Sequence, residues 1–148
     1  MKGILDFLYT YKFVIVPFAV WFGIQLFKLM YDLFKTKKFN FKRIMQAGGM
    51  PSSHSAVVVS LATMIGKNVG LSSPLFGLAL IFAFVVMYDA AGVRRAAGKQ
   101  AKLLNKLIET PGLSSMQVSE KLVEVLGHTP IQVIVGAFIG LVVGFVVG

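Results

Sequence analysis

The chain has 148 residues, enough for one domain, and 56% of them are hydrophobic while only 14% are charged. Water-soluble globular proteins carry roughly 25% charged residues, so this composition excludes an ordinary soluble domain and indicates a membrane protein. The formal net charge of +9 calls for an anionic counterpart, and the lack of cysteine excludes a disulfide framework and a thiolate metal site.

Four apolar segments are long enough to cross the hydrocarbon core, which takes about 20 helical residues. Residues 1–12 are expected to lie at the interface, with aromatic side chains at headgroup level. The spans are predicted at residues 13–34, 51–70, 74–92 and from 128 or 130 to 148. The Ser and Thr content of the second also suits a shorter helix surrounded by protein. The predicted fold class is therefore all-α, an integral membrane helical bundle of about four transmembrane helices in a single domain, residues 1–148.

Basic residues gather in two of the connections between these spans. Eleven of the fifteen lysines and arginines lie between spans one and two or between spans three and four. Because basic loops tend to stay in the cytoplasm, both connections are expected on the cytoplasmic side of the cell (inner or plasma) membrane, with both termini on the far side. Interleaved membrane spans favour anionic membrane lipid over nucleic acid as the partner of this charge.

The connection between spans three and four is the only sizeable polar region. Residues 96–108 are predicted to continue the third helix, with leucines on one face and lysines opposite. Thr110-Pro111-Gly112 breaks that helix. A capping pattern at residues 114–117 predicts a short amphipathic helix, which Gly127 ends.

The segment from Gly48 to Ala56 reads Gly-Gly-Met-Pro-Ser-Ser-His-Ser-Ala and precedes an apolar run. Pro51 fits the first turn of a helix, whose free N–H groups and positive dipole end attract an anion such as phosphate. Gly49 and its neighbour allow the backbone to approach a ligand closely. The segment predicts either a phosphate pocket with a catalytic His54 or a plain Pro/Ser cap with an incidental histidine.

The second of the two histidines, His128, also stands at the start of an apolar helix, two residues before Pro130. By the charge argument, both helix starts open on the same side of the membrane. We therefore expect two helix N-termini and the imidazoles of His54 and His128 to face one anion.

Ionisable residues at membrane depth are costly and usually functional. At the end of span three, Arg94, Arg95 or both are predicted to bind phosphate oxygens. The alternative is that Asp89 pairs with one arginine and both arginines extend toward the interface. In span one, Gln25 and Lys28 share a helix face, and Lys28 is expected to bind a phosphate or carboxylate unless it extends to the interface.

Small residues recur every four positions along the fourth span, at Gly136, Gly140, Gly144 and Gly148. Such a stripe is typical of closely packed membrane helices. The pattern fits packing within the chain and also a homo-oligomer.

Together these residues resemble the type-2 phosphatidic acid phosphatase superfamily, which includes vanadium haloperoxidases, and above all its divergent branch of small membrane proteins. Pro51-Ser52-Ser53-His54 is similar to the superfamily's Pro-Ser-Gly-His motif. Residues 128–140 are similar to its last motif, His-x-x-x-Asp-Val-x-x-Gly-x-x-x-Gly, and the divergent branch is also matched at residues 25–28, 48–56, 88–95 and 126–130.

The resemblance implies hydrolysis of a lipid phosphate or pyrophosphate without a metal or cofactor. His128 would be the nucleophile and form a phosphohistidine, and His54 would protonate the leaving oxygen. The phosphate oxygens would be held by Lys28, by Arg94 or Arg95, and by backbone N–H groups near Ser52 and Ser53.

Three departures from the superfamily pattern rearrange the charges around this histidine pair. Gln132 replaces the Asp that orients the nucleophile, Leu122 replaces an Arg six residues before it, and the Lys-to-Arg-Pro spacing of the first motif is missing. Asp89 or Glu124 could replace the lost carboxylate. The competing prediction, favoured by Gln132, is a non-catalytic binder or transporter of phosphorylated lipid.

Overall fold

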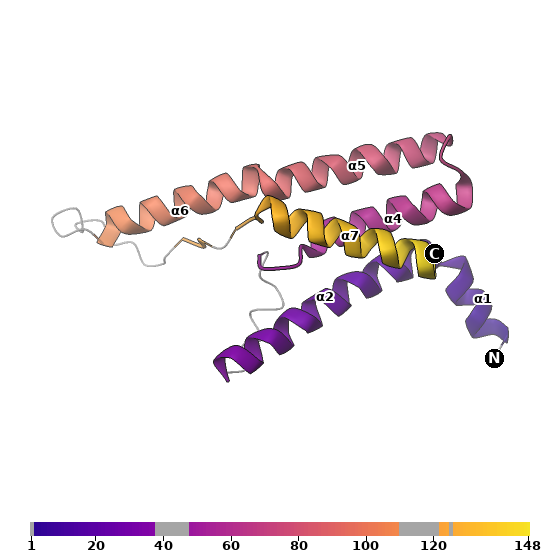
Figure 1. The fold of residues 1–148 in the computed structure, drawn as a ribbon, viewed down its shortest axis with the longest axis horizontal. Coiled ribbons are helices and arrows are strands. Elements are labelled where there is room, and N and C mark those ends of the chain that lie inside the picture. Colours follow the sequence, from indigo (N-terminus) through magenta and orange to yellow (C-terminus); the bar gives the residue numbers. More distant parts are fainter. Residues whose placement is uncertain (1, 38–47, 110–121, 125) are drawn as a thin grey trace.

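The computed structural model describes residues 2–37, 48–109, 122–124 and 126–148 (Figure 1). These residues form helices and connecting segments. The helices are α1 (Lys2–Thr10), α2 (Lys12–Thr36), α4 (Ser53–Val69), α5 (Pro74–Ala91), α6 (Val93–Glu109) and α7 (Pro130–Val147). Pro74 and Pro130 each occupy the first turn of their helix, where a missing N–H costs nothing.

Three described helices are long and apolar enough to cross a membrane: α2, the joined α5 and α6, and α7. The remaining predicted span is α4, whose 17 residues extend about 26 Å at 1.5 Å per residue. Nine residues of α4 are buried, and it packs against α7, α5 and α2. The protein is thus an all-α membrane bundle, and α4 is its shorter, protein-surrounded helix, the alternative that its Ser and Thr content allowed.

The α4–α7 contact depends on the glycine stripe. Gly136, Gly140 and Gly144 are buried in α7 and face the backbone oxygens of Ser52, Ala56 and Ser60, one helical turn apart along α4. A Cβ at Gly144 would lie 2.6 Å from the Ser60 oxygen. The stripe therefore lets two helix backbones touch within this chain, as small residues do in membrane bundles.

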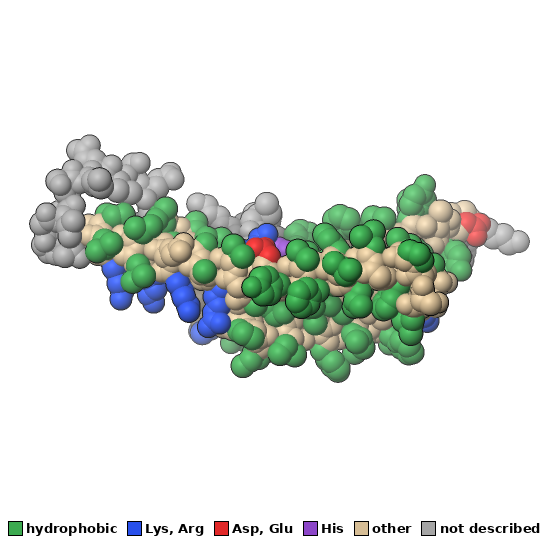
Figure 2. Space-filling model, turned by 90° about the horizontal axis from the view of Figure 1, so that it is seen from above, with side chains coloured by type: hydrophobic (Ala, Val, Ile, Leu, Met, Phe, Trp, Pro, Cys, Tyr) green, Lys and Arg blue, Asp and Glu red, His purple; other side chains and the backbone are tan. Residues whose placement is uncertain are grey.

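Apolar side chains fill the space on both sides of α4. Val16, Val20 and Ile24 of α2 pack with Ala56 and Met64, and Phe13, Ile139 and Val143 lie against this cluster. On the other side, Ala62 and Ile65 contact Ala79 of α5. The outer faces of α2, α5 and α7 remain apolar, as a lipid-facing surface requires, while lysines project from α6 (Figure 2).

Near the first histidine, the predicted helix start is displaced by two residues. α4 begins at Ser53 with Ser52 as its N-cap, so Pro51 precedes the cap and does not lie in the first turn. The Ser52 side chain accepts a hydrogen bond from the Ser55 N–H at 3.3 Å, and this capping bond fixes the start.

The third connection departs from its predicted helix. Residues 114–121 and 125 lie outside the described residues, while Leu122, Val123 and Glu124 have no regular structure. The amide side chain of Asn105 binds both the N–H and the carbonyl oxygen of Leu122, at 3.0 and 2.9 Å. These bonds use the backbone groups of Leu122 for docking on α6, so the last turn of the predicted amphipathic helix does not form.

Candidate functional site at the start of helices α4 and α7

The two helices that carry the histidines begin side by side. The Ser52 N–H donates to the Gln132 carbonyl oxygen at 3.1 Å, across the α4–α7 contact. The ring centroids of His54 and His128 lie 6.0 Å apart, with an angle of 58° between the ring planes. The structure thus brings together two imidazoles that are 74 positions apart in the sequence, at the N-termini of two helices.

His128 is fixed by its backbone and enclosed by its surroundings. Its N–H donates to the Ala90 carbonyl oxygen at 2.9 Å, which ties it to the end of α5. The residue is 2% exposed, and neither ring nitrogen has a hydrogen-bond partner among the described residues. A buried imidazole without a hydrogen-bond partner is costly, so a ligand that bonds to a ring nitrogen of His128 would gain stabilisation there.

Burial also decides the charge of His128. Loss of hydration, followed by the positive charge of Lys28, lowers the pKa of its imidazole to about 4. The Gln132 side chain and the Gly49 backbone lie near the ring and act in the opposite direction, but more weakly. His128 is therefore neutral at pH 7, the form in which an imidazole nitrogen is nucleophilic.

Gln132 takes part in the N-cap of α7. Its Oε1 accepts the Thr129 N–H at 2.9 Å, and the Thr129 hydroxyl accepts the Gln132 N–H at 3.4 Å. This reciprocal pair is a capping box, and it engages the side-chain oxygen of the residue that stands in place of the orienting Asp. Asp89 and Glu124, the predicted substitutes, hydrogen-bond to Arg94 and Asn105 respectively.

His54 lies in the first turn of α4 and faces several charges. Its Nδ1 is buried without a hydrogen-bond partner among the described residues. Arg94, Lys28 and Asp89 are all close enough to act electrostatically on its ring. The surroundings of the ring therefore carry a net positive charge, which stabilises a developing negative charge. We call His54, His128, Lys28 and Arg94 the histidine corner.

Lys28 connects the first span to the glycine turn. Its Nζ donates to the Gly48 carbonyl oxygen at 3.0 Å, and Gly49 follows with a φ of 81°, in the region that favours glycine. Gln25, one helical turn earlier, is buried at 6% exposure on the same helix. Lys28 is thus half-buried, bonded to the Gly48 backbone, and close enough to act electrostatically on both histidines.

The two arginines at the end of the third span differ in surroundings. The Arg94 Nε donates to the Asp89 Oδ2 at 2.5 Å, in an ion pair that is 44% exposed on the arginine and 37% on the aspartate. Arg95 is half-buried, and its backbone packs against Gly127, whose φ is 83°. Asp89 thus pairs with Arg94, and Arg94 is also the arginine whose charge acts on His54.

The serines at the start of α4 stabilise the backbone around the histidine corner through hydrogen bonds and burial. The Ser52 hydroxyl accepts from the Ser55 N–H and from the Ser55 hydroxyl, the latter at 2.9 Å, while its N–H serves Gln132. Ser53 is buried at 4% exposure in the first turn. Ser52 therefore has its polar groups engaged within the protein, so the backbone N–H groups of the first turn of α4 are the better anion donors.

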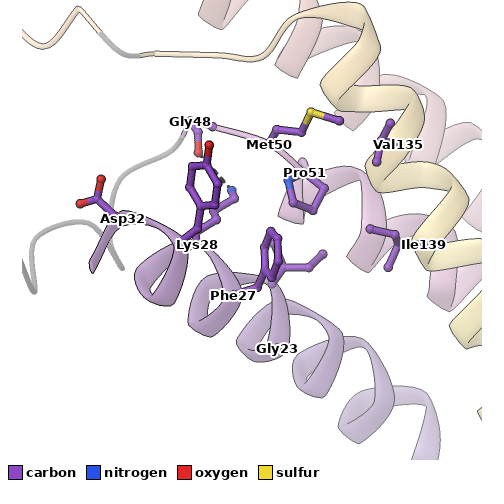
Figure 3. A pocket seen from close by; sticks show the side chains of 12 residues that line it. Gly23, Phe27, Lys28, Asp32, Gly48, Met50, Pro51, Val135 and Ile139 are labelled. Atoms are coloured by element: carbon purple, nitrogen blue, oxygen red, sulfur yellow. Dashed lines mark hydrogen bonds between the residues drawn. The ribbon is translucent and has the colours of Figure 1, made fainter. Parts of the chain in front are cut away.

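A groove opens beside this corner, between α2 and α7 (Figure 3). Its volume is about 780 Å³. Phe27 points into it from α2, and Val135 and Ile139 form the opposite wall on α7. Lys28, Gly48 and Gly49 line one end, so the groove and the histidine corner share Lys28.

Two backbone groups at the site have no signal in the sequence. The carbonyl oxygens of Gly48 and Ala90 position Lys28 and His128, yet a carbonyl is common to all residue types. The glycine pair was the only available hint of the first, and nothing in the sequence indicated the second.

Residues 9–143 match the family described as the Divergent PAP2 family. The "Uncharacterized membrane protein YuiD" of Bacillus subtilis (strain 168) is similar, with 38% identity over 133 residues that cover 82% of this chain and 84% of that protein. No solved structure matches the chain significantly. With its apolar helices and a family match over most of its length, this membrane protein belongs to the Divergent PAP2 family.

Proposed function

We propose that this protein is a lipid phosphate or pyrophosphate phosphatase that works through a phosphohistidine on His128. The observation that carries the proposal is the 6.0 Å separation of the His54 and His128 rings at two adjacent helix N-termini. Family membership supports the same chemistry, because type-2 phosphatidic acid phosphatases use a pair of histidines as the resemblance implies.

In the first step, a ring nitrogen of His128 attacks phosphorus while the bond between phosphorus and the lipid oxygen breaks. Protonated His54 gives its proton to that oxygen, which leaves as an alcohol or, from a pyrophosphate, as a phosphate. In the second step, water attacks the phosphohistidine, His54 takes the proton, and inorganic phosphate leaves. One substrate molecule and one water are consumed, and both histidines return to their starting state.

Positive groups around the histidines stabilise the phosphoryl group in both steps. Lys28 and Arg94 supply charge, and the first turns of α4 and α7 supply N–H groups and the positive ends of two helix dipoles. Arg94 donates to Asp89 through its Nε, so its remaining N–H groups can reach a phosphate oxygen, and its exposure permits the movement that this requires.

The site is assigned to the cytoplasmic face of the cell membrane. The basic connections support this assignment, because α4 and α7, which carry the histidines at their starts, begin at the end of the bundle from which the basic helix α6 projects (Figure 1). A lipid substrate then presents its headgroup at the inner leaflet.

A second candidate function is binding or transport of a phosphorylated lipid without hydrolysis. The capping role of Gln132 favours it, because no carboxylate among the described residues stabilises the His128 imidazolium. Loss of the corresponding aspartate in serine proteases reduces turnover about ten-thousandfold.

Phosphate release by purified protein in detergent separates the two functions. The assay compares wild type, His54→Ala and His128→Ala on a panel of radiolabelled lipid phosphates and pyrophosphates, followed by acid-free quenching to retain phosphohistidine. We expect release and a protein-bound label in wild type, and loss of both in His128→Ala. His54→Ala is expected to slow both steps.

Two results count against the proposal. Turnover that survives His128→Ala would show that His128 is not the nucleophile. Background release by all three proteins would reject the phosphatase and favour non-catalytic binding. Equilibrium binding of the same lipids distinguishes a binder from an inactive preparation.

A further inference from the structure

We propose that the groove between α2 and α7 binds the hydrocarbon chain of the substrate, so that the protein takes lipid phosphates directly from the bilayer through this side. This inference rests on the proposed function, and it names the substrate class and the route of that same site. The occupant is one acyl or prenyl chain whose phosphate lies at the histidines.

The polar groups of the groove lie toward one end, and the histidines lie beside the groove without lining it. Lys28, Gly48 and Gly49 line that end, and Lys28 acts electrostatically on both imidazoles. Tyr31 and Asp32 also line the groove, in the next helical turn of α2, and their polar groups suit hydroxyls of a headgroup. Lys28 can therefore pair with an anionic head and Asp32 can accept hydrogen bonds from its hydroxyls, while the apolar tail follows the rest of the groove.

The walls beyond Lys28 are apolar. Ile24 and Phe27 of α2 face Val135 and Ile139 of α7, with Met50 and Pro51 between the two helices. The volume of about 780 Å³ lies within the range of known ligand pockets, roughly 300–1,000 Å³. A hydrocarbon chain attached to a phosphate at the histidines therefore has a continuous apolar path along α2.

Gly23 keeps this path open. It lines the groove about 7.5 Å along the helix axis from Lys28, at 1.5 Å per residue. A Cβ at this position would meet nothing within 4 Å, unlike the glycines of the α4–α7 contact. Its lack of a side chain therefore serves no helix packing in the described chain, but it does widen the groove.

A second groove provides the contrast. It lies between α4, α5 and α7, holds about 520 Å³, and is lined by apolar residues and Thr63 without a cation. Bulk lipid tails suffice to fill such a surface. Only the α2–α7 groove combines an apolar path with the charged corner among the two described grooves.

The test compares two substrates with the same head: glycerol phosphate, which has no chain, and oleoyl glycerol phosphate. The variant Gly23→Leu fills the groove, and Gly77→Leu is the matched control, because Gly77 is also helical with no atom within 4 Å of its Cβ and lines neither groove. We expect Gly23→Leu to lower the ratio of kcat/KM for the oleoyl substrate to that for glycerol phosphate about tenfold, the effect of displacing two buried methylene groups. Gly77→Leu should leave the ratio unchanged.

If the ratio is unchanged in Gly23→Leu and both substrates are still hydrolysed, the groove does not bind the hydrocarbon chain, while the phosphatase proposal stands. A binding experiment covers the reverse case. Oleoyl glycerol phosphate with a photoreactive group in its chain should label α2 and α7 around Phe27 and Ile139 in wild type, and less in Gly23→Leu. Labelling without any hydrolysis would support the groove and reject the phosphatase, whereas labelling only elsewhere would reject the groove.

Discussion

The backbone N–H of Ser52 donates to the carbonyl oxygen of Gln132, so the residue before α4 is bonded directly to the first turn of α7. Further along α7, Gly136 and Gly140 bring the two helix backbones into contact. The spacing of His54 and His128 is therefore determined by backbone contacts over several helical turns, and each prediction below disturbs one part of this arrangement.

The Gly140→Ala substitution tests the α4–α7 contact. Its Cβ would overlap the backbone oxygen of Ala56, so the helices must separate, and overpacking of this kind costs about 1–3 kcal/mol. We expect a lower midpoint of thermal unfolding in detergent and slower turnover. Gly77→Ala, which adds a methyl group in open space, should not lower the midpoint. Equal midpoints for the two variants would contradict the contact.

The protonation of His128 can be followed directly, because the chain has two histidines and His54→Ala leaves one. We expect the NMR signals of its ring to titrate near pH 4, far below the ordinary value of 6.5. Lys28→Gln should raise this midpoint, because a neighbouring positive charge is removed. A midpoint near 6.5 would show that the ring is hydrated.

The same shift predicts acid sensitivity of the fold. Between pH 6.5 and about 4 the unfolded chain binds a proton on this histidine while the folded protein does not, so stability falls as the pH is lowered through that window. Thermal unfolding of His54→Ala against His54→Ala/His128→Asn across that range isolates the contribution. A matching pH dependence in both proteins would contradict it.

Gln132→Glu restores a negative charge near His128 without losing the capping box, since Glu accepts the same Thr129 N–H. The charge favours the imidazolium, so we expect a higher pKa of His128 and faster turnover. Gln132→Leu loses the side-chain half of the capping box, while Thr129 still caps the backbone N–H at that position, so it should destabilise the protein by about 1 kcal/mol, the contribution of one hydrogen bond. A Gln132→Glu variant that folds well but turns over no faster would show that charge at this position does not limit the rate.

Arg94→Gln and Arg95→Gln separate the two arginines. Of the two arginines, Arg94 is the one whose charge acts on His54, so its loss should reduce kcat/KM about a hundredfold, as for other oxyanion-stabilising groups, and the loss of Arg95 much less. Asp89→Asn is the control for the broken ion pair, because it frees Arg94 and keeps its charge. The reverse ranking of the arginines would reassign the phosphate contact to Arg95.

The sequence predicted those parts of the molecule that depend on composition and local pattern. The helices near 13–34, 74–92 and 130–148 follow from their apolar length, and α6 follows from its leucine and lysine periodicity. The meeting of His54 and His128 followed from charge sidedness and from the position of both residues at helix starts.

What the sequence left open depends on competition for backbone groups. Ser52 displaces Pro51 as the start of α4 because its hydroxyl caps the helix, and Asn105 binds Leu122 in place of a helical partner. The engagement of Gln132 with Thr129 and of Arg94 with Asp89 is likewise a choice among several partners within reach. Side-chain types indicate which bonds are available, but only the packed structure selects among them.

The glycine stripe between α4 and α7 fixes the distance between the two helices at the site. Since main-chain atoms define this distance, exchanging the outward-facing side chains of α7 leaves the opening between the imidazoles at the same size. The lipid-facing surface can thus change to suit bilayers of different composition while the distance between the two imidazoles stays constant.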